Sequence, residues 1–308
     1  MQQALVIYGI NNLFTLKMAD GALLEASIKG KTLNVDKLDY NPLACGDRVT
    51  LDENKQITQR LERKNSLQRL NNKGNLLKIQ TLCANIDLVL CVVAINQPPL
   101  HSRFLDRLLI SAEAGEVLPV IVINKADLAI NDEELAHINL YQKLGYKVIL
   151  TSTVNGQGLP QLKELCHNKT VALMGASGVG KSSLLNRLLG INLKTAELNK
   201  KFKRGNHTTN YAIFLEQPAG GYLIDTPGVR SLSPPITEAE QLAGYYRDFT
   251  PHITNCAYAN CLHLNEEDCG IKAAVAAGLI DESRYRGYVK LIEEISEQSR
   301  QISRYKKM

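Results

Sequence analysis

Two short motifs occur in this chain in an order that limits the folds it can adopt. Residues 124–127 read Asn-Lys-Ala-Asp, the NKxD pattern that selects guanine. Residues 175–182 read GASGVGKS, which matches the phosphate-binding P-loop pattern G-x-x-x-x-G-K-S/T. In an ordinary small GTPase the P-loop comes first and NKxD comes late. Either one match is accidental, or the chain is a GTPase domain that has been cut and rejoined by circular permutation.

The second motif has the flanking sequence that a P-loop requires. An apolar segment, VALMG (171–175), leads into it and the amphipathic segment SSLLNRLLG (182–190) follows it, which predicts a strand, a loop and a helix. The loop N–H groups at the helix start would bind phosphate, with Lys181 reaching the β- and γ-phosphates and the Ser182 hydroxyl binding Mg²⁺. The expected nucleotide-binding residues here are Gly175, Ala176, Ser177, Gly178, Val179, Gly180, Lys181, Ser182 and Ser183.

The NKxD motif follows the apolar segment VIVIN (120–124), and ligands of parallel sheets gather at such strand ends. The Asp127 carboxylate can accept hydrogen bonds from N1–H and the exocyclic amino group of guanine, a donor pair that adenine lacks. We expect Asn124, Lys125 and Ala126 to complete this base-binding loop. The segment TSTVNGQG (151–158) fits a third base-contacting loop, in which Ser152 and Thr153 touch the nucleotide.

A DxxG pattern, Asp225-Thr226-Pro227-Gly228, follows the apolar segment YLI. We expect Asp225 to hold Mg²⁺ through water and the Gly228 N–H to sense the γ-phosphate. Upstream lies Gly205-Asn206-His207-Thr208-Thr209, in which either Thr208 or Thr209 would complete the Mg²⁺ shell. The sequence leaves open which threonine does so.

Residue Val229 stands where many GTPases place the glutamine that orients the attacking water. Valine cannot do this, so we expect slow intrinsic hydrolysis and help from a partner or another side chain. His207 is the nearest candidate in the sequence. The alternative is an ordinary surface histidine.

The chain divides into three parts by its hydrophobic pattern. Residues 1–66 carry short strand-like segments separated by turn signals, which predicts a small closed β-barrel. Residues 67–233 alternate strand and helix patterns, which predicts a parallel sheet covered on both sides. Residues 234–308 follow Pro234-Pro235 and end in a helix from about Glu282 with an apolar face. We therefore predict a multidomain α/β protein.

Three cysteines and one histidine near the C-terminus have metal-ligand spacing, Cys256-x4-Cys261-x-His263-x5-Cys269. A filled set of three thiolates and an imidazole suits tetrahedral, structural Zn²⁺, one ion per chain. His252 is a reserve ligand, and buried thiols without metal are the alternative. The other cysteines are expected to be buried apolar residues: Cys45, Cys83, Cys91 and Cys166.

Basic charge is concentrated at two places. Residues 60–78 hold six basic residues against one acidic residue, and residues 194–204 hold five against one, although the whole chain has a net charge of only +5. Such stretches favour a nucleic-acid partner, and solvated surface is the alternative. No apolar run approaches the ~20 residues that span a bilayer, and the N-terminus does not read as a signal peptide. We expect a cytoplasmic protein with no membrane partner.

Together these motifs identify a resemblance that covers nearly the whole chain. The segments that carry it are GDRV (46–49), RKNSLQR (63–69), QPPLHSRFLDRLL (97–109), EAG (113–115), PVIVINKADL (119–128), GASGVGKSSLLNRL, GNHTT, DTPGVR and the Cys/His cluster. The chain resembles the RsgA (YjeQ/EngC) family of circularly permuted GTPases. The resemblance implies an OB-fold barrel (1–66), a permuted GTPase domain (67–233) and a helical zinc-binding domain (234–308).

The resemblance also implies a function. Members of this family act in late maturation of the small (30S) ribosomal subunit, bind its rRNA, and hydrolyse GTP to GDP and phosphate faster on that particle. The expected protein is a Mg²⁺-dependent, monomeric GTPase, with both basic stretches near RNA and His207 inheriting a proposed catalytic role. Two alternatives are a GTP-gated RNA-binding checkpoint and a signalling GTPase with a protein effector.

Overall fold

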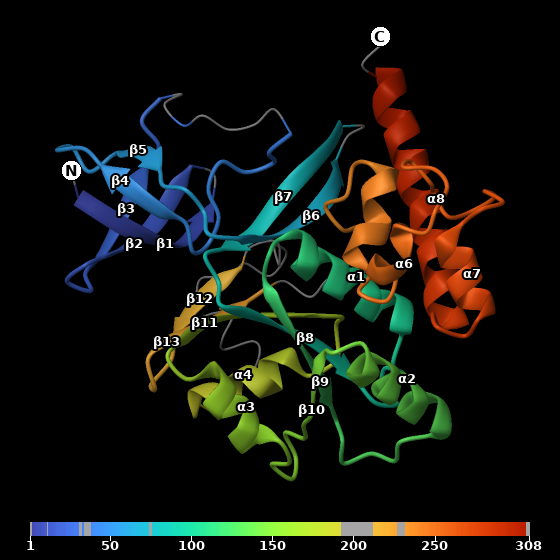
Figure 1. Cartoon of the computed structure of the whole chain (residues 1–308). Coiled ribbons are helices and arrows are strands. Elements are labelled where there is room, and N and C mark those ends of the chain that lie inside the picture. The colour runs from blue at the N-terminus through green and yellow to red at the C-terminus, as the bar shows by residue number, and fades with distance from the viewer. Residues whose placement is uncertain are drawn as a thin grey trace.

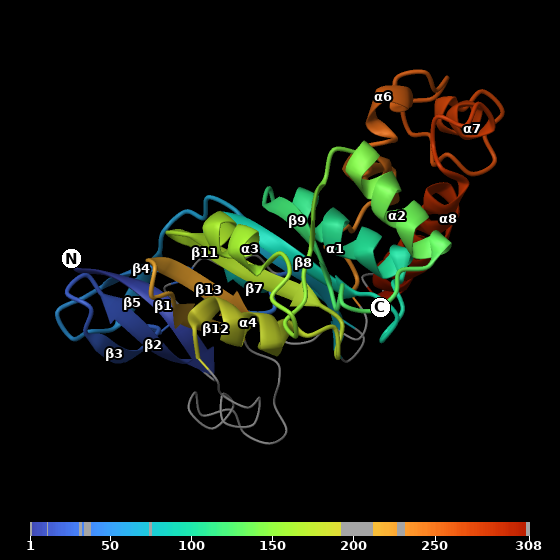
Figure 2. The same ribbon diagram turned by 90° about the horizontal axis from the view of Figure 1, so that it is seen from below.

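The computed structural model describes residues 2–10, 12–30, 33, 38–73, 76–191, 212–226 and 232–305. The chain forms an N-terminal β domain, a central sheet flanked by helices, and a C-terminal group of helices (Figure 1). The β domain and the C-terminal helices lie at opposite ends of the central sheet (Figure 2). No helix in the described ranges is long and apolar enough to cross a membrane.

The N-terminal domain is an antiparallel sheet that closes on itself. Its strands run in the order β3-β2-β1-β4-β5. They span Gln2–Ile10 (β1), Leu13–Met18 (β2), Leu23–Ser27 (β3), Arg48–Leu51 (β4) and Ile57–Arg60 (β5). A bridge between Ile28 and Ile57 joins the two edges, so no long edge is left open. Alternate side chains, among them Leu16 and Val49, fill its interior at 0% exposure. The predicted barrel is confirmed.

A two-stranded hairpin, β6 (Ser66–Lys73) and β7 (Leu76–Ala84), follows the barrel and forms a sheet of its own. This hairpin was not predicted from the sequence. Bridges from Asp39 to Ile79 and from Cys45 to Cys83 attach it to the chain that enters β4. On its other edge the Leu70 N–H donates to the Ser233 carbonyl.

The central sheet has six strands in the order β10-β9-β8-β11-β13-β12. They span Leu88–Ala94 (β8), Leu118–Asn124 (β9), Lys147–Leu150 (β10), Lys169–Gly175 (β11), Ile213–Glu216 (β12) and Gly221–Asp225 (β13). All neighbours are parallel except β12 and β13. The chain therefore enters at the centre, fills one half outward, and returns to place β11 beside β8. This return produces the unusual motif order.

Two helices cover each face of the sheet. The helices are α1 (Ser102–Ala114), α2 (Asp132–Lys143), α3 (Leu159–Cys166) and α4 (Lys181–Leu189). One face of β8, including Val89 and Cys91, packs with α1 and α2. The alternating residues Leu88 and Leu90 pack with α3 and α4 on the other face. The strands are apolar on both sides because both sides are covered, as predicted.

The C-terminal region consists of the 3₁₀ helix η1 (Ala239–Tyr245) and the helices α6 (Thr250–Ile253), α7 (Gly270–Ala276) and α8 (Glu282–Tyr305). Its core contains Tyr246, Phe249 and Tyr288, whose rings pack at centroid distances of 4.8–5.6 Å. Ile110 of α1 belongs to the same core, so this region packs directly on the GTPase domain. The apolar face predicted for the last helix is confirmed, with Ile292 fully buried.

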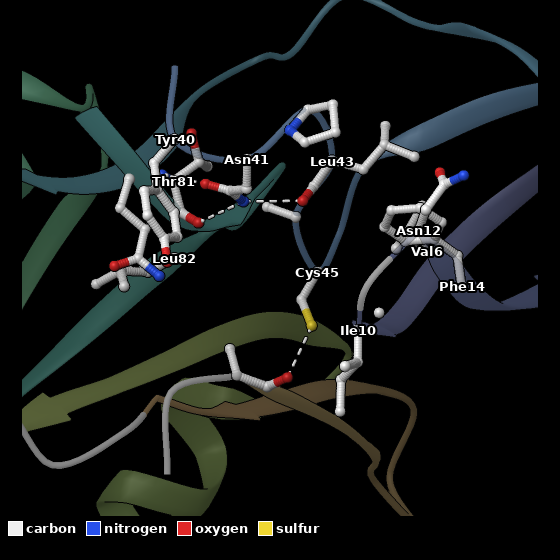
Figure 3. Close-up of a pocket in the computed structure, with 15 residues that line it drawn as sticks. Val6, Ile10, Asn12, Phe14, Tyr40, Asn41, Leu43, Cys45, Thr81 and Leu82 are labelled. Carbon is white, nitrogen blue, oxygen red and sulfur yellow. Dashed lines mark hydrogen bonds between the residues drawn. The ribbon is translucent and has the colours of Figure 1, made fainter. Parts of the chain in front are cut away.

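The barrel meets the central sheet at Cys45 (Figure 3). Its thiol donates to the carbonyls of Ile7 and Ala212, each at 2.9 Å, and Ala212 directly precedes β12. Burial raises the pKa of this thiol to about 12, so it stays protonated and able to donate. Cys45, Cys83, Cys91 and Cys166 are all buried, as the sequence predicted.

Candidate nucleotide site and metal centre

The motif-bearing loops gather at one edge of the central sheet. The parallel register pairs Ala94 with Asn124, Val92 with Gly175, and Leu173 with Asp225. The NKxD, P-loop and DxxG motifs therefore begin at the carboxyl ends of neighbouring or next-but-one strands. This is the edge at which open α/β sheets bind ligands.

The P-loop adopts a conformation that only glycine allows at several positions. Gly178 and Gly180 have φ values of 84° and 95°, which are strained for other residues. A Cβ atom at Gly175 would lie 2.3 Å from the Val92 carbonyl oxygen. Helix α4 begins at Lys181, so its first N–H groups face the loop and can bind an anion.

The Lys181 ammonium lies over the P-loop. Its Nζ donates to the carbonyls of Gly175 at 2.8 Å and Ala176 at 2.7 Å. Burial lowers the pKa of this lysine, and the nearby Asp225 charge opposes that shift. The lysine is thus held beside the space that phosphate oxygens occupy in such loops.

Asn124 connects the two nucleotide loops. Its amide donates to the Val179 carbonyl at 2.9 Å, and its Oδ1 accepts from the Thr151 hydroxyl at 3.3 Å. The side chain is 1% exposed, and a Cβ at Gly180 would come within 2.2 Å of its Nδ2. Asn124 therefore fastens the NKxD loop to the P-loop, a contact that sequence spacing does not reveal.

Asp127 is oriented by a neighbouring loop. The Ser152 hydroxyl donates to Asp127 Oδ1 and accepts from the N–H of Val154 at 3.1 Å. Ser152 is fully buried, so in this structure it supports the carboxylate. The Lys125 ammonium donates to the Gln97 carbonyl. Ala126 is fixed through its N–H, which donates to Thr151 O at 3.0 Å.

Two residues make supporting contacts that the sequence did not predict. Arg187 of α4 donates to the Thr153 carbonyl at 2.7 Å, which ties the third base loop to the P-loop helix. The Thr226 hydroxyl, 1% exposed, donates to Leu173 O and anchors the start of the DxxG motif on β11. Both contacts join residues that are far apart in the chain.

Of the residues predicted to hold magnesium, the structure describes Ser182 and Asp225 but not the two threonines. Ser182 lies in the first turn of α4, and Asp225 ends β13, which pairs with β11 directly before the P-loop. Ser183 is exposed in the same first turn. Gly228, His207, Thr208 and Thr209 lie outside the described residues.

The four predicted zinc ligands form one cluster. The ligand atoms of Cys256, Cys261, His263 and Cys269 all lie within 4.8 Å of one another. His263 Nδ1 is 3.5 Å from the Cys256 sulfur and 3.4 Å from the Cys269 sulfur. Tetrahedral Zn²⁺ spaces its ligand atoms about 3.5–4 Å apart, so the donor set fits zinc. The reserve candidate His252 lies on α6, outside this cluster.

Burial and contacts from helix α8 define the surroundings of the cluster. Burial, together with the neighbouring thiols, raises the pKa of Cys261 to about 12, whereas a bound metal ion favours the thiolate. Helix α8 supports the ligand loop, because Tyr285 donates to His263 O at 2.7 Å and Tyr288 donates to Leu262 O at 2.9 Å. These contacts orient the loop from outside the ligand set.

The sheet and its loops define a circularly permuted P-loop GTPase. Comparison with known families agrees: a family described as RsgA GTPase matches residues 60–234, and one described as 50S ribosome-binding GTPase matches residues 170–305. The chain belongs to the RsgA GTPase family.

Relatives cover most of the chain. The small ribosomal subunit biogenesis GTPase RsgA of Borreliella burgdorferi is 36% identical over 296 residues, covering 94% of this chain and 95% of the relative. The corresponding protein of Caldanaerobacter subterraneus is 42% identical over 224 residues, which cover 72% of this chain and 75% of the relative.

Solved structures share the fold. YjeQ from Thermotoga maritima has a TM-score of 0.70 at 32% identity and covers 96% of this chain and 98% of its own. The circularly permuted GTPase YloQ has a TM-score of 0.68 at 25% identity, covering 97% and 96%. The predicted family, fold class and GTPase activity are confirmed.

Proposed function

We propose that this GTPase binds the small ribosomal subunit through its rRNA, assists late maturation of that particle, and hydrolyses GTP faster while bound to it. Its relatives are small ribosomal subunit biogenesis GTPases, which supports this proposal. The structural observation that supports the GTPase part of the proposal is the convergence of the NKxD loop and the P-loop through Asn124.

Each site residue has a proposed role. The Asp127 carboxylate accepts hydrogen bonds from the two guanine N–H donors, while Ser152 fixes the orientation of that carboxylate. The Lys181 ammonium exchanges the carbonyls of Gly175 and Ala176 for phosphate oxygens. The N–H groups at the start of α4 bind the remaining phosphate charge.

Magnesium would be held by Ser182, by Asp225 through water, and by Thr208 or Thr209; when bound it neutralises charge on the phosphate oxygens. The Gly228 N–H is proposed to sense the γ-phosphate. His207 is proposed to position the attacking water, since Val229 cannot. Zinc would be structural and would hold the ligand loop against α8.

Cosedimentation with purified small subunits tests this function. We expect retention on the subunit with a non-hydrolysable GTP analogue and weaker retention with GDP. Equal retention with both nucleotides, or none with either, would contradict the proposal. Retention that depends on GTP without any stimulated turnover would instead favour the checkpoint alternative, in which hydrolysis only triggers release.

A further inference from the structure

A wide cleft lies between the GTPase domain and the C-terminal helices. It has a volume of about 1020 Å³, and its lining includes residues of α1 and α8. It reaches the P-loop at Ala176 and Val179, and it also borders Leu232 and Ser233. A ligand in this cleft would therefore touch the loop that binds the nucleotide phosphates.

Cations line both walls of the cleft. Arg103 and Arg107 come from α1, and Arg286 and Lys290 come from α8. Each pair is four residues apart, so its members lie on the same side of their helix. Among the described residues that line the cleft, only Glu133 and Glu294 are carboxylates.

Three of these cations are available for a ligand. Arg103 and Lys290 are exposed, and neither forms an ion pair with any described residue. Arg286 lies 4.0 Å from Glu282 with both side chains about 70% exposed, an arrangement of little strength. The Arg107 side chain is not available, because it already donates to both carboxylate oxygens of Glu294 and to the Leu232 carbonyl.

The walls of the cleft are fixed to each other by a buried ion pair. Arg284 of α8 pairs with Asp106 of α1 and, at 2.8 Å, with Asp248, and all three are at most 9% exposed. Nearby, a Cβ on Gly287 would lie 3.4 Å from Asp106 Oδ2 and 3.7 Å from Arg103 Cγ. The two helices thus approach closely, and the cations are presented in a preformed arrangement.

Three arginines of the basic stretch 60–78, in contrast, are engaged within the fold. Arg63 binds both oxygens of the fully buried Asp47. Arg60 donates to the Pro42 carbonyl at 3.0 Å, and Arg69 donates to Gln80 at 3.0 Å. These three arginines stabilise the barrel and the hairpin, so they are not free to bind RNA.

We propose that the cleft between α1 and α8 binds the phosphate backbone of RNA, with Arg103, Arg286 and Lys290 as the contacts. The proposal rests on the function proposed above and names a surface for it. Protein interfaces have apolar or aromatic cores. The cleft also has apolar lining residues, among them the half-buried Leu100 and Phe104, but none of the large apolar side chains that are exposed among the described residues lies in it. Unpaired cations on two fixed walls suit a polyanion, and arginine suits phosphate in particular.

The test compares two triple variants of the full-length, zinc-loaded protein. The cleft variant carries Arg103→Gln, Arg286→Gln and Lys290→Gln. The control carries Lys147→Gln, Lys163→Gln and Lys169→Gln, which remove the same charge near the opposite, amino-terminal edge of the sheet. Affinity for purified small subunits, and for a duplex RNA oligonucleotide, is measured over a series of KCl concentrations.

Loss of three phosphate contacts should weaken RNA binding at least tenfold at low salt and reduce the slope of log Kd against log salt by about 2–3. The control should bind as the unmodified protein does. Equal slopes for the two variants, or no binding of either RNA probe by the unmodified protein, would overturn the proposal. Duplex RNA bound through the cleft without any binding to subunits would retain the cleft and refute the proposed function. Displacement of RNA by polyglutamate at equal charge concentration would identify an acidic-protein site and overturn the RNA assignment.

Discussion

The side-chain amide of Asn124 donates to the carbonyl of Val179 at 2.9 Å and joins two nucleotide loops that are 55 positions apart in the chain. In the permuted strand order, β9 and β11 are separated only by β8. The base-binding loop precedes the phosphate-binding loop in sequence, yet the two meet in space. Asn124 is the residue that connects them.

Asn124→Ala should therefore weaken binding of both GTP and GDP. The change leaves the buried Val179 carbonyl without its donor, and we expect the free energy of unfolding to fall by about 1–3 kcal/mol. Denaturant unfolding and a titration with fluorescent GDP measure the two effects. Asn139→Ala, at an exposed position of α2, is the matched control. Unchanged nucleotide affinity in Asn124→Ala would show that the contact is incidental.

Asp127→Asn should shift base preference away from guanine. The amide presents an N–H group where the carboxylate accepts, so we expect GTP affinity to fall at least a hundredfold. Competition by xanthosine triphosphate, whose ring carries a carbonyl in place of the amino group, should improve. Asp132→Asn in the exposed first turn of α2 is the control. Retained GTP selectivity would count against this role of Asp127.

Arg284→Met should strongly destabilise the fold, because it leaves the buried Asp106 and Asp248 without their cation. We expect a loss of about 3–5 kcal/mol in the free energy of unfolding at neutral pH. Arg286→Met, on the exposed side of the same helix, should change it by no more than about 0.5 kcal/mol. Denaturant unfolding of the two variants measures the difference.

The loss in Arg284→Met should also depend on pH. Burial already raises the pKa of Asp106, and Arg284 opposes that shift, so the pKa rises further without the arginine. An acid with a higher pKa in the folded than in the unfolded state takes up a proton on folding, so acidification favours the fold. The variant should regain part of its lost stability between pH 7 and pH 5. A loss of stability that is constant between pH 7 and pH 5 would show that protonation of Asp106 does not contribute to it.

Removal of the metal ion should unfold the C-terminal region before the rest of the protein. Residues 256–269 contain all four predicted ligands, and Tyr285 and Tyr288 of α8 bind carbonyls of this segment. A chelator should abolish amide protection beyond about residue 236 before protection in the central sheet is lost. His263→Ala should lose its zinc, whereas His252→Ala should still bind one ion per chain. Unchanged C-terminal protection after stripping would contradict a structural role for the metal.

The nucleotide loops could be predicted from sequence because phosphate binding imposes local constraints. Gly178 and Gly180 have left-handed backbone conformations, and such requirements leave a readable pattern. The Cys/His cluster was predictable for the same reason, since four side chains that can bind a metal ion lie within fourteen residues of sequence, 256–269.

The supporting contacts could not be predicted because they join distant parts of the chain. Arg284 lies on a helix whose apolar face was predicted, but its partners Asp106 and Asp248 are 178 and 36 positions away. Arg63 belongs to a basic stretch that suggested RNA binding, yet its guanidinium is paired with the buried carboxylate of Asp47. Charge along a sequence shows which residues are basic. It does not show which of them remain free after folding.

His207→Ala should retain GTP binding and lose most of the turnover stimulated by small subunits. The reason is that Val229 cannot position water, and His207 is the nearest candidate in the sequence. His167→Ala, an exposed position after α3, is the control. Single-turnover assays with bound subunits measure the effect. Near-normal stimulated turnover in His207→Ala would assign the histidine no catalytic part.

The central claim is that a permuted GTPase site is activated by the small ribosomal subunit. GTP turnover by the unmodified protein, measured with and without purified small subunits over a series of KCl concentrations, tests it most directly. We predict slow turnover without subunits, a large increase with small subunits, and a steep loss of that increase as salt rises. Turnover that small subunits leave unchanged at every salt concentration would contradict it.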